Sequence, residues 1–198
     1  MRILYTASEA LPYAASGGLA DVAGSLPAAL CKAGHDCRVV LPLYKSIKPE
    51  LRKDLRFLMN FTVDVGWRKQ YCGVFEGHAN NVTYYLLDNE YYYARDGLYG
   101  FYDDCERFVF LSRAVMELIR HIDWKPQIIN CNDWQTALVP VYYQTYYKYQ
   151  HGYEDIKTVF TIHNIQYQGK YGMDVLNEVM GIPMYHANLL EYDGCINM

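Results

Sequence analysis

Three short groups of polar residues lie beside apolar segments, and their side chains could bind or transform a ligand. The groups are Ser16-Gly17-Gly18, Asn132-Asp133-Trp134 and His163-Asn164. The second and third follow the apolar runs 127–131 and 158–162, which are typical of buried strands. Ligands of open α/β sheets bind beyond the carboxyl ends of the strands. We therefore expect the polar groups to form one site.

Gly17 and Gly18 precede a segment with helical spacing, so the backbone there could approach a ligand closely. Free N–H groups at a helix N-terminus suit a phosphate, although two glycines before a helix can also form a plain turn. Asp21, in the first turn, could serve the site or only offset the helix dipole. About ten residues separate the first strand from Gly17, unlike the dinucleotide fingerprint, which argues against a nicotinamide dehydrogenase.

Asp133 and His163 each allow a structural and a functional interpretation. Asp133 could be the N-cap of a helix over 135–147, or its carboxylate could hydrogen-bond a sugar hydroxyl in a cleft. His163 could be a structural histidine at a strand end or part of the site. The sequence contains neither a nucleophile triad nor a cluster with metal-ligand spacing, so we expect no metal and no bound cofactor.

The periodicity predicts an α/β fold with a parallel sheet flanked by helices. Strands over 2–7 and 37–41 with a helix over 19–30 between them form a βαβ unit, and Pro27 is expected to kink this helix. Short turns at 66–69 and 78–81 indicate an antiparallel insertion. The remaining predictions are strands over 58–65, 70–76 and 82–87, an irregular stretch over 88–104, helices over 106–122 and 135–147, and strands over 127–131 and 158–162.

Composition narrows the function classes. The formal net charge is −4 and no run of Lys or Arg exceeds two residues, so we expect no nucleic-acid partner. Apolar runs are shorter than a membrane span, and six scattered cysteines show no paired or zinc-like spacing. We expect free thiols, a cytoplasmic location and no membrane association. The 21 tyrosines could pack the core or stack on sugar rings.

The order of several motifs resembles bacterial starch and glycogen synthases over essentially the whole chain. The motifs are Ser8–Ala14 (SEALPYA), Ser16–Val22 (SGGLADV), Asp88–Tyr91 (DNEY) with Tyr99-Gly100 and Arg107-Phe108, Asn132–Pro140 (NDWQTALVP) and Phe160–Gly169 (FTIHNIQYQG).

This resemblance implies that residues 1–198 are a single domain, the N-terminal acceptor-side half of a GT-B glycosyltransferase, without the C-terminal donor-binding domain. It implies glucosyl transfer from a nucleotide sugar, usually ADP-glucose, to the non-reducing end of an α-1,4-glucan, with retention and without a metal. Gly17 and Gly18 would face the donor diphosphate. The resemblance places His163 and Asp133 in catalysis, and Ser16, Asp21, Tyr99 and Asn164 with the two glycines in substrate binding.

Two positions depart from the family pattern. Ala15 stands where the family usually has lysine, which removes a cation beside the diphosphate and leaves the nucleotide preference open. Asn132 replaces the histidine of a usual His-Asp-Trp motif. A non-catalytic glucan-binding module derived from such an enzyme is the alternative function. We expect the 198-residue chain alone to fold without transferring glucose.

Overall fold

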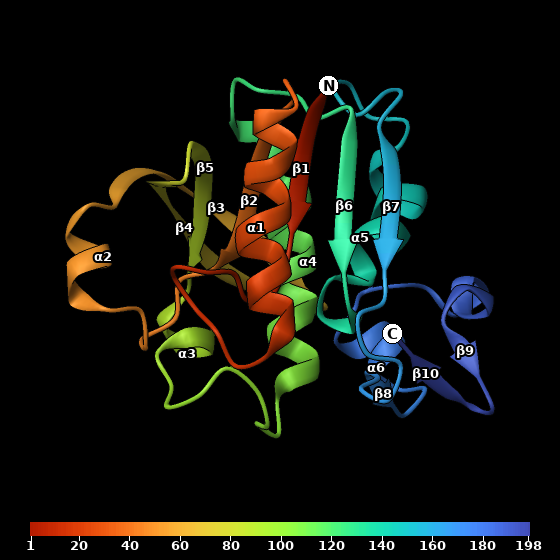
Figure 1. The fold of residues 1–198 in the computed structure, drawn as a ribbon. Coiled ribbons are helices and arrows are strands. Elements are labelled where there is room, and N and C mark those ends of the chain that lie inside the picture. The colour runs from red at the N-terminus through yellow and green to blue at the C-terminus, as the bar shows by residue number, and fades with distance from the viewer.

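A computed structural model describes residues 1–198 and places seven strands in one sheet, in the order β3-β4-β5-β2-β1-β6-β7 (Figure 1). The central strands β5, β2, β1, β6 and β7 run parallel to one another. This confirms the predicted parallel sheet. The strands are β1 (Arg2–Thr6), β2 (Asp36–Pro42), β3 (Arg56–Val65), β4 (Arg68–Ala79), β5 (Val82–Asp88), β6 (Ile128–Asn132) and β7 (Lys157–Thr161).

The predicted antiparallel insertion is also confirmed, and it extends the same sheet. β4 pairs antiparallel with both β3 and β5. The strands of this insertion are longer than predicted, so the turns between β3 and β4 and between β4 and β5 have only two residues each. In the second turn Asn80 and Asn81 have φ values of 51° and 62°, the backbone that a tight hairpin turn requires.

Helices cover both faces of the sheet. Helix α1 (Gly18–Lys32) lies on one face and includes the buried Pro27. Helix α4 (Asp104–His121) lies on the other face, where it packs against α5 (Leu138–Tyr142) and β3 (Figure 1). The apolar core consists of 54 buried residues and extends from the sheet into the C-terminal part of the chain.

Two predicted segments differ from the structure. The predicted helix over 135–147 is divided into the 3₁₀ turn η1 (Trp134–Thr136), α5 and the π turn η2 (Tyr143–Tyr147). Pro140 lacks the N–H that a continuous helix would use at this point. The stretch over 88–104 is not wholly irregular, because it contains α3 (Glu90–Tyr93), whose first turn the Asn89 side chain caps at Tyr92 N over 3.1 Å.

The last thirty or so residues form a second, three-stranded sheet for which the sequence predicted nothing. Its order is β8-β10-β9, and the Tyr142 hydroxyl joins it to the main body by donating to Met180 O over 2.8 Å. The elements of this part are β8 (Lys170–Tyr171), α6 (Val175–Glu178), η3 (Met184–Leu189), β9 (Glu191–Tyr192) and β10 (Cys195–Asn197). One further short helix, α2 (Pro49–Lys53), lies between β2 and β3.

Many tyrosines pack the core. Tyr5, Tyr44, Tyr84, Tyr92 and Tyr93 are fully buried. Others surround a cation, since the Arg113 guanidinium lies over the rings of three tyrosines of α5 and η2. The packing interpretation therefore holds for these residues. All six cysteines are free thiols, and none of the helices combines the length and the apolar character that crossing a membrane would need.

Candidate active site

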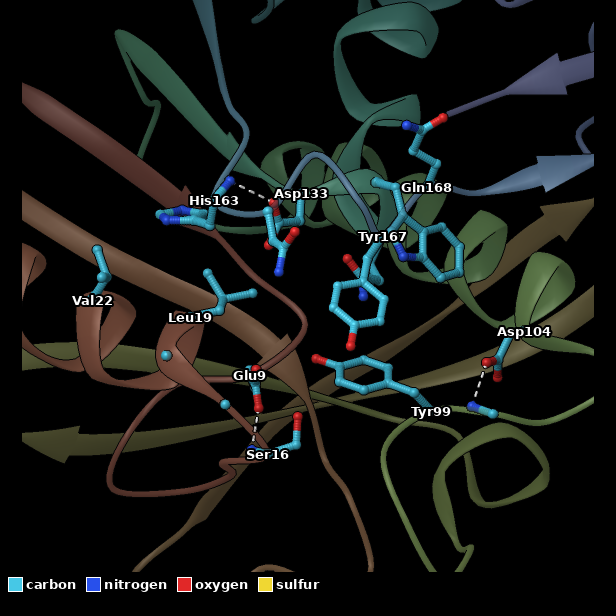
Figure 2. A pocket seen from close by; sticks show the side chains of 16 residues that line it. Glu9, Ser16, Leu19, Val22, Tyr99, Asp104, Asp133, His163, Tyr167 and Gln168 are labelled. Atoms are coloured by element: carbon cyan, nitrogen blue, oxygen red, sulfur yellow. Dashed lines mark hydrogen bonds between the residues drawn. The ribbon is translucent and has the colours of Figure 1, made fainter.

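A cavity of about 820 Å³ opens at the carboxyl ends of β1, β6 and β7, against the N-terminus of α1 (Figure 2). The three polar groups of the sequence meet there, as expected for the edge of a parallel sheet. The lining residues are Glu9, Ser16, Gly17, Gly18, Leu19, Val22, Tyr99, Gly100, Asp104, Asp133, Trp134, Gln135, His163, Asn164, Tyr167 and Gln168.

Seven of the eight predicted site residues line this cavity, and Asp21 does not. Helix α1 lines the cavity through Gly18, Leu19 and Val22, whereas the Asp21 side chain is exposed to solvent. Asp21 lies in the first turn of α1, where its carboxylate offsets the helix dipole, as the second interpretation of this residue states.

Asp133 joins the two strand ends. Its carboxylate Oδ1 accepts a hydrogen bond from His163 N over 2.7 Å, and its own N–H donates to Thr161 O over 2.9 Å. The side chain makes no capping bond to η1, so the N-cap interpretation is wrong. Asp133 has φ 57° and ψ 175°, a backbone conformation almost confined to glycine. Such strain is held by surrounding contacts and is typical of functional sites.

The His163 ring is also attached to the end of β6. His163 Nε2 lies 2.9 Å from Oδ1 of the buried Asn132, while the rest of the side chain is exposed at the cavity. The histidine is thus fixed at its backbone by Asp133 and at its ring by Asn132. This arrangement gives the imidazole a defined orientation and leaves one ring nitrogen without a protein partner.

Glu9 organises the glycine-containing loop. Its side chain is only 3% exposed, and its carboxylate accepts a hydrogen bond from Ser16 N (Figure 2). Burial raises the pKa of Glu9, the Ser16 and Gly17 hydrogen bonds partly offset this rise, and the nearby Asp133 charge adds to it. The N–H groups of Gly18 and Leu19, which open α1, have no partner within the helix and remain able to bind an anion.

Tyr99 is positioned by a rigid loop. Its hydroxyl lies 2.7 Å from Ser8 Oγ, and burial raises its pKa. Next to it, Gly100 N donates to Asp104 Oδ2 over 2.7 Å. The fully buried Arg107 fixes this loop, because it donates to Leu98 O over 3.0 Å and to Asp104 Oδ1 over 2.6 Å.

Gln135 presents an unused hydrogen-bond acceptor. It lines the cavity with 8% of its surface exposed, and its Oε1 atom is buried without any partner. A buried polar atom without a partner is unfavourable and is usually explained by a ligand or a function.

The site is also lined by five residues that were not predicted to belong to it: Glu9, Asp104, Gln135, Tyr167 and Gln168. For Glu9 a signal was present, since Ser8 and Glu9 follow the first strand as the other polar groups follow theirs. Asp104 lies in the first turn of a helix, far along the chain, and no local pattern links it to the strand ends. No group of three or more His, Cys, Asp or Glu side chains is arranged to hold a metal ion.

Comparison with known proteins identifies the family of this chain. The family of the starch synthase catalytic domain matches residues 2–198. The chain belongs to this family. A glycogen synthase of Clostridium botulinum (strain Alaska E43 / Type E3) is 53% identical over 182 residues, which are 91% of this chain and 38% of that protein. A glycogen synthase of Clostridium beijerinckii is 51% identical and covers 98% of this chain, which spans 41% of that protein.

A solved structure of the same family has the same fold. The catalytic domain of starch synthase IV from Arabidopsis thaliana, bound to ADP and acarbose, superposes with a TM-score of 0.88 at 29% identity. The match covers 98% of this chain and 41% of the solved one. The chain therefore spans about two fifths of the length of these starch and glycogen synthase relatives. Its α/β fold is that of the first part of their catalytic domain.

Proposed function

We propose that this chain is the acceptor-side part of a glycogen synthase. The proposed enzyme transfers glucose from ADP-glucose to the non-reducing end of an α-1,4-glucan with retention at the anomeric carbon. The observation that carries the proposal is the cavity, which joins an anion-binding helix N-terminus at Gly18 to the polar groups of Asp133 and His163. The starch synthase of similar structure was solved with ADP and acarbose, ligands of the same two kinds.

The proposed roles follow from the charge that develops during transfer. As the glucosyl bond breaks, negative charge grows on the diphosphate and positive charge on the sugar. The N–H groups at the start of α1 stabilise the diphosphate. The Asp133 carboxylate and carbonyl oxygens near His163 stabilise the sugar, and Tyr99 orients its hydroxyls. In this proposal no metal ion or other cofactor takes part.

A second domain completes the proposed site. In the proposed two-domain enzyme, the donor is held mainly by residues beyond this chain, and closure of the two domains removes water from the reacting groups. Such an enzyme acts on ADP-glucose and glycogen in the cytoplasm and needs neither nucleic acid nor membrane. Ala15 lies in the loop that would face the donor. The rates of transfer from ADP-glucose and from UDP-glucose, measured side by side, show which donor the enzyme prefers.

The test is a transfer assay with the full-length gene product. We expect label from ADP-[¹⁴C]glucose to enter maltohexaose, and NMR of the product to show new α-1,4 linkages. Replacement of Asp133 by Asn is expected to abolish this transfer, whereas the control Asp64→Asn, on the exposed part of β3, is expected to retain it. Binding of maltohexaose without any turnover would reject the enzyme and favour a glucan-binding module.

A further inference from the structure

The amide of Asn132 is held in one orientation. The side chain is 1% exposed, and its Nδ2 donates to Thr6 O over 2.9 Å and to Asn130 Oδ1 over 2.8 Å. A backbone carbonyl such as Thr6 O can only accept a hydrogen bond. The NH₂ group of Asn132 must therefore face Thr6, and its carbonyl oxygen must face the other way.

That carbonyl oxygen points at His163. Asn132 Oδ1 lies 2.9 Å from His163 Nε2, and an amide oxygen has no proton to give. His163 Nε2 must therefore carry the proton of this hydrogen bond. In the neutral imidazole the other nitrogen, Nδ1, is then an acceptor, and the hydrogen bond at one nitrogen decides the state of the other.

We propose that Asn132 is a positioning residue that fixes His163 in its Nε2–H tautomer, so that Nδ1 accepts a hydrogen bond from a hydroxyl group of the glucosyl ligand. This inference rests on the proposed function for the identity of the ligand, but its tautomer part does not. The backbone of His163 is fixed independently by Asp133 Oδ1 over 2.7 Å. Ring and backbone together leave the imidazole little freedom to turn away from the cavity.

Asn132 stands where the family usually has histidine, and this difference affects the hydrogen bond to His163. A histidine that accepts a hydrogen bond loses this ability when it takes up a proton, whereas an amide oxygen accepts at every pH. Asn132 thus supplies a permanent acceptor to His163.

The tautomer is read by NMR of the full-length gene product labelled with ¹⁵N at histidine, with His163→Gln used to assign the signals. We expect His163 to show a protonated Nε2 and an unprotonated Nδ1, with an Nε2 proton that exchanges slowly. In Asn132→Leu we expect this proton to exchange rapidly and the two nitrogen signals to move toward an average. The control Asn130→Ala leaves Thr6 O to hold the amide and is expected to keep the wild-type pattern.

A double-mutant cycle tests whether the hydrogen bond between Asn132 and His163 contributes to glucosyl transfer. Asn132→Leu is expected to lower kcat/KM for glucosyl transfer about tenfold, the size of one lost hydrogen bond, and to add nothing further in a His163→Gln background. Additive losses in the double variant would reject the positioning role. An Nδ1–H or averaged pattern in the wild-type spectrum would overturn the tautomer, whatever the enzyme transfers or fails to transfer. An inactive gene product with the expected spectrum would instead reject the proposed function and leave the tautomer standing.

Discussion

Glu9 is a carboxylate that the fold holds in a buried place beside a second carboxylate, Asp133. Burial and this neighbouring charge raise the pKa of Glu9 above its unfolded value, so the native state binds its proton more tightly. The stability that the protonated form contributes is fully present below the unfolded pKa of about 4.3 and is lost as pH rises through the folded pKa.

In Glu9→Gln the side chain at this position is neutral at every pH. The variant therefore does not lose stability as pH rises through the folded pKa of Glu9. We expect the free energy of unfolding of the Gln variant, relative to wild type, to increase as pH rises above the unfolded pKa of Glu9 and to level off once pH has passed the folded pKa. Urea unfolding at several pH values measures this difference. Parallel curves for the two proteins would show that Glu9 is not destabilised in its charged form.

Ala15 marks the position where the family usually carries lysine. It is exposed beside Ser16 at the cavity, so a lysine there can reach a bound phosphate without disturbing the core. We expect Ala15→Lys in the full-length gene product to tighten ADP binding by about 1–2 kcal/mol, the size of a charge-assisted hydrogen bond. Calorimetric titration with ADP measures this gain. The control is Ser25→Lys, which adds the same charge on an exposed part of α1, and an equal gain there would indicate a general charge effect.

Site residues were predictable from the sequence where a strand end and a helix start lie close to them in the chain. Asp133, His163 and the Ser16–Gly18 loop belong to this class, because sheet topology alone brings strand ends together. The side-chain partners were not predictable. That Asp133 bonds to His163 N instead of capping η1 depends on a backbone angle of φ 57° for which no sequence pattern exists at an aspartate.

Among the elements, the turn between β3 and β4 packs against the end of α6. Gly66 has φ 56°, and a Cβ atom built there would lie 2.1 Å from Glu178 O at the end of α6. Gly66→Ala is therefore expected to destabilise residues 1–198 by more than its backbone strain alone. Gly34→Ala is a matched control, since Gly34 has φ 86° but no atom within 4 Å of an added Cβ.

We expect Gly34→Ala to lower the free energy of unfolding by about 1–2 kcal/mol, through the left-handed backbone alone. Gly66→Ala should lower it by about 2 kcal/mol more, because a backbone atom must shift to make room. Midpoints of urea unfolding decide the comparison. Equal losses in both variants would mean that the turn does not support α6.

Helices and strands were predicted where their apolar pattern in the sequence is strong, and were missed where it is weak. Helix α4 was predicted from its long apolar periodicity, and the parallel strands were predicted from apolar runs of five or six residues. The division of the helix over 135–147 was missed although Pro140, which lacks the N–H of a continuous helix, lies inside it. The Arg113 guanidinium packs against the divided segment, 4.7 and 4.9 Å from the ring centres of Tyr142 and Tyr146. The small sheet after Gly169 was missed because its strands are two or three residues long.

At the scale of the whole molecule, β7 is an edge strand with apolar side chains in solvent. Val159 and Phe160 of β7 are 44% and 42% exposed, and Ile162 and Ile165 in the segment that follows it are 54% and 65% exposed. An apolar edge of this kind favours self-association. We expect residues 1–198 to form dimers or larger species in light scattering, and Ile162→Lys to reduce them. Trp67→Lys, at a residue 78% exposed in the turn between β3 and β4 at the opposite edge of the sheet, should change nothing. Monomers at every concentration would contradict this expectation.

In the proposed function, the cavity of this chain is one wall of a glucosyltransferase site that a second domain completes. One wall cannot hold donor and acceptor in register or exclude water, so residues 1–198 should fold yet leave glycogen unlabelled. The most direct measurement is incorporation of glucose from ADP-[¹⁴C]glucose into glycogen by the full-length gene product and by residues 1–198 in parallel. We predict rapid labelling by the full-length gene product and no labelling above background by residues 1–198. Labelling by residues 1–198 at a rate near that of the full-length protein would contradict it.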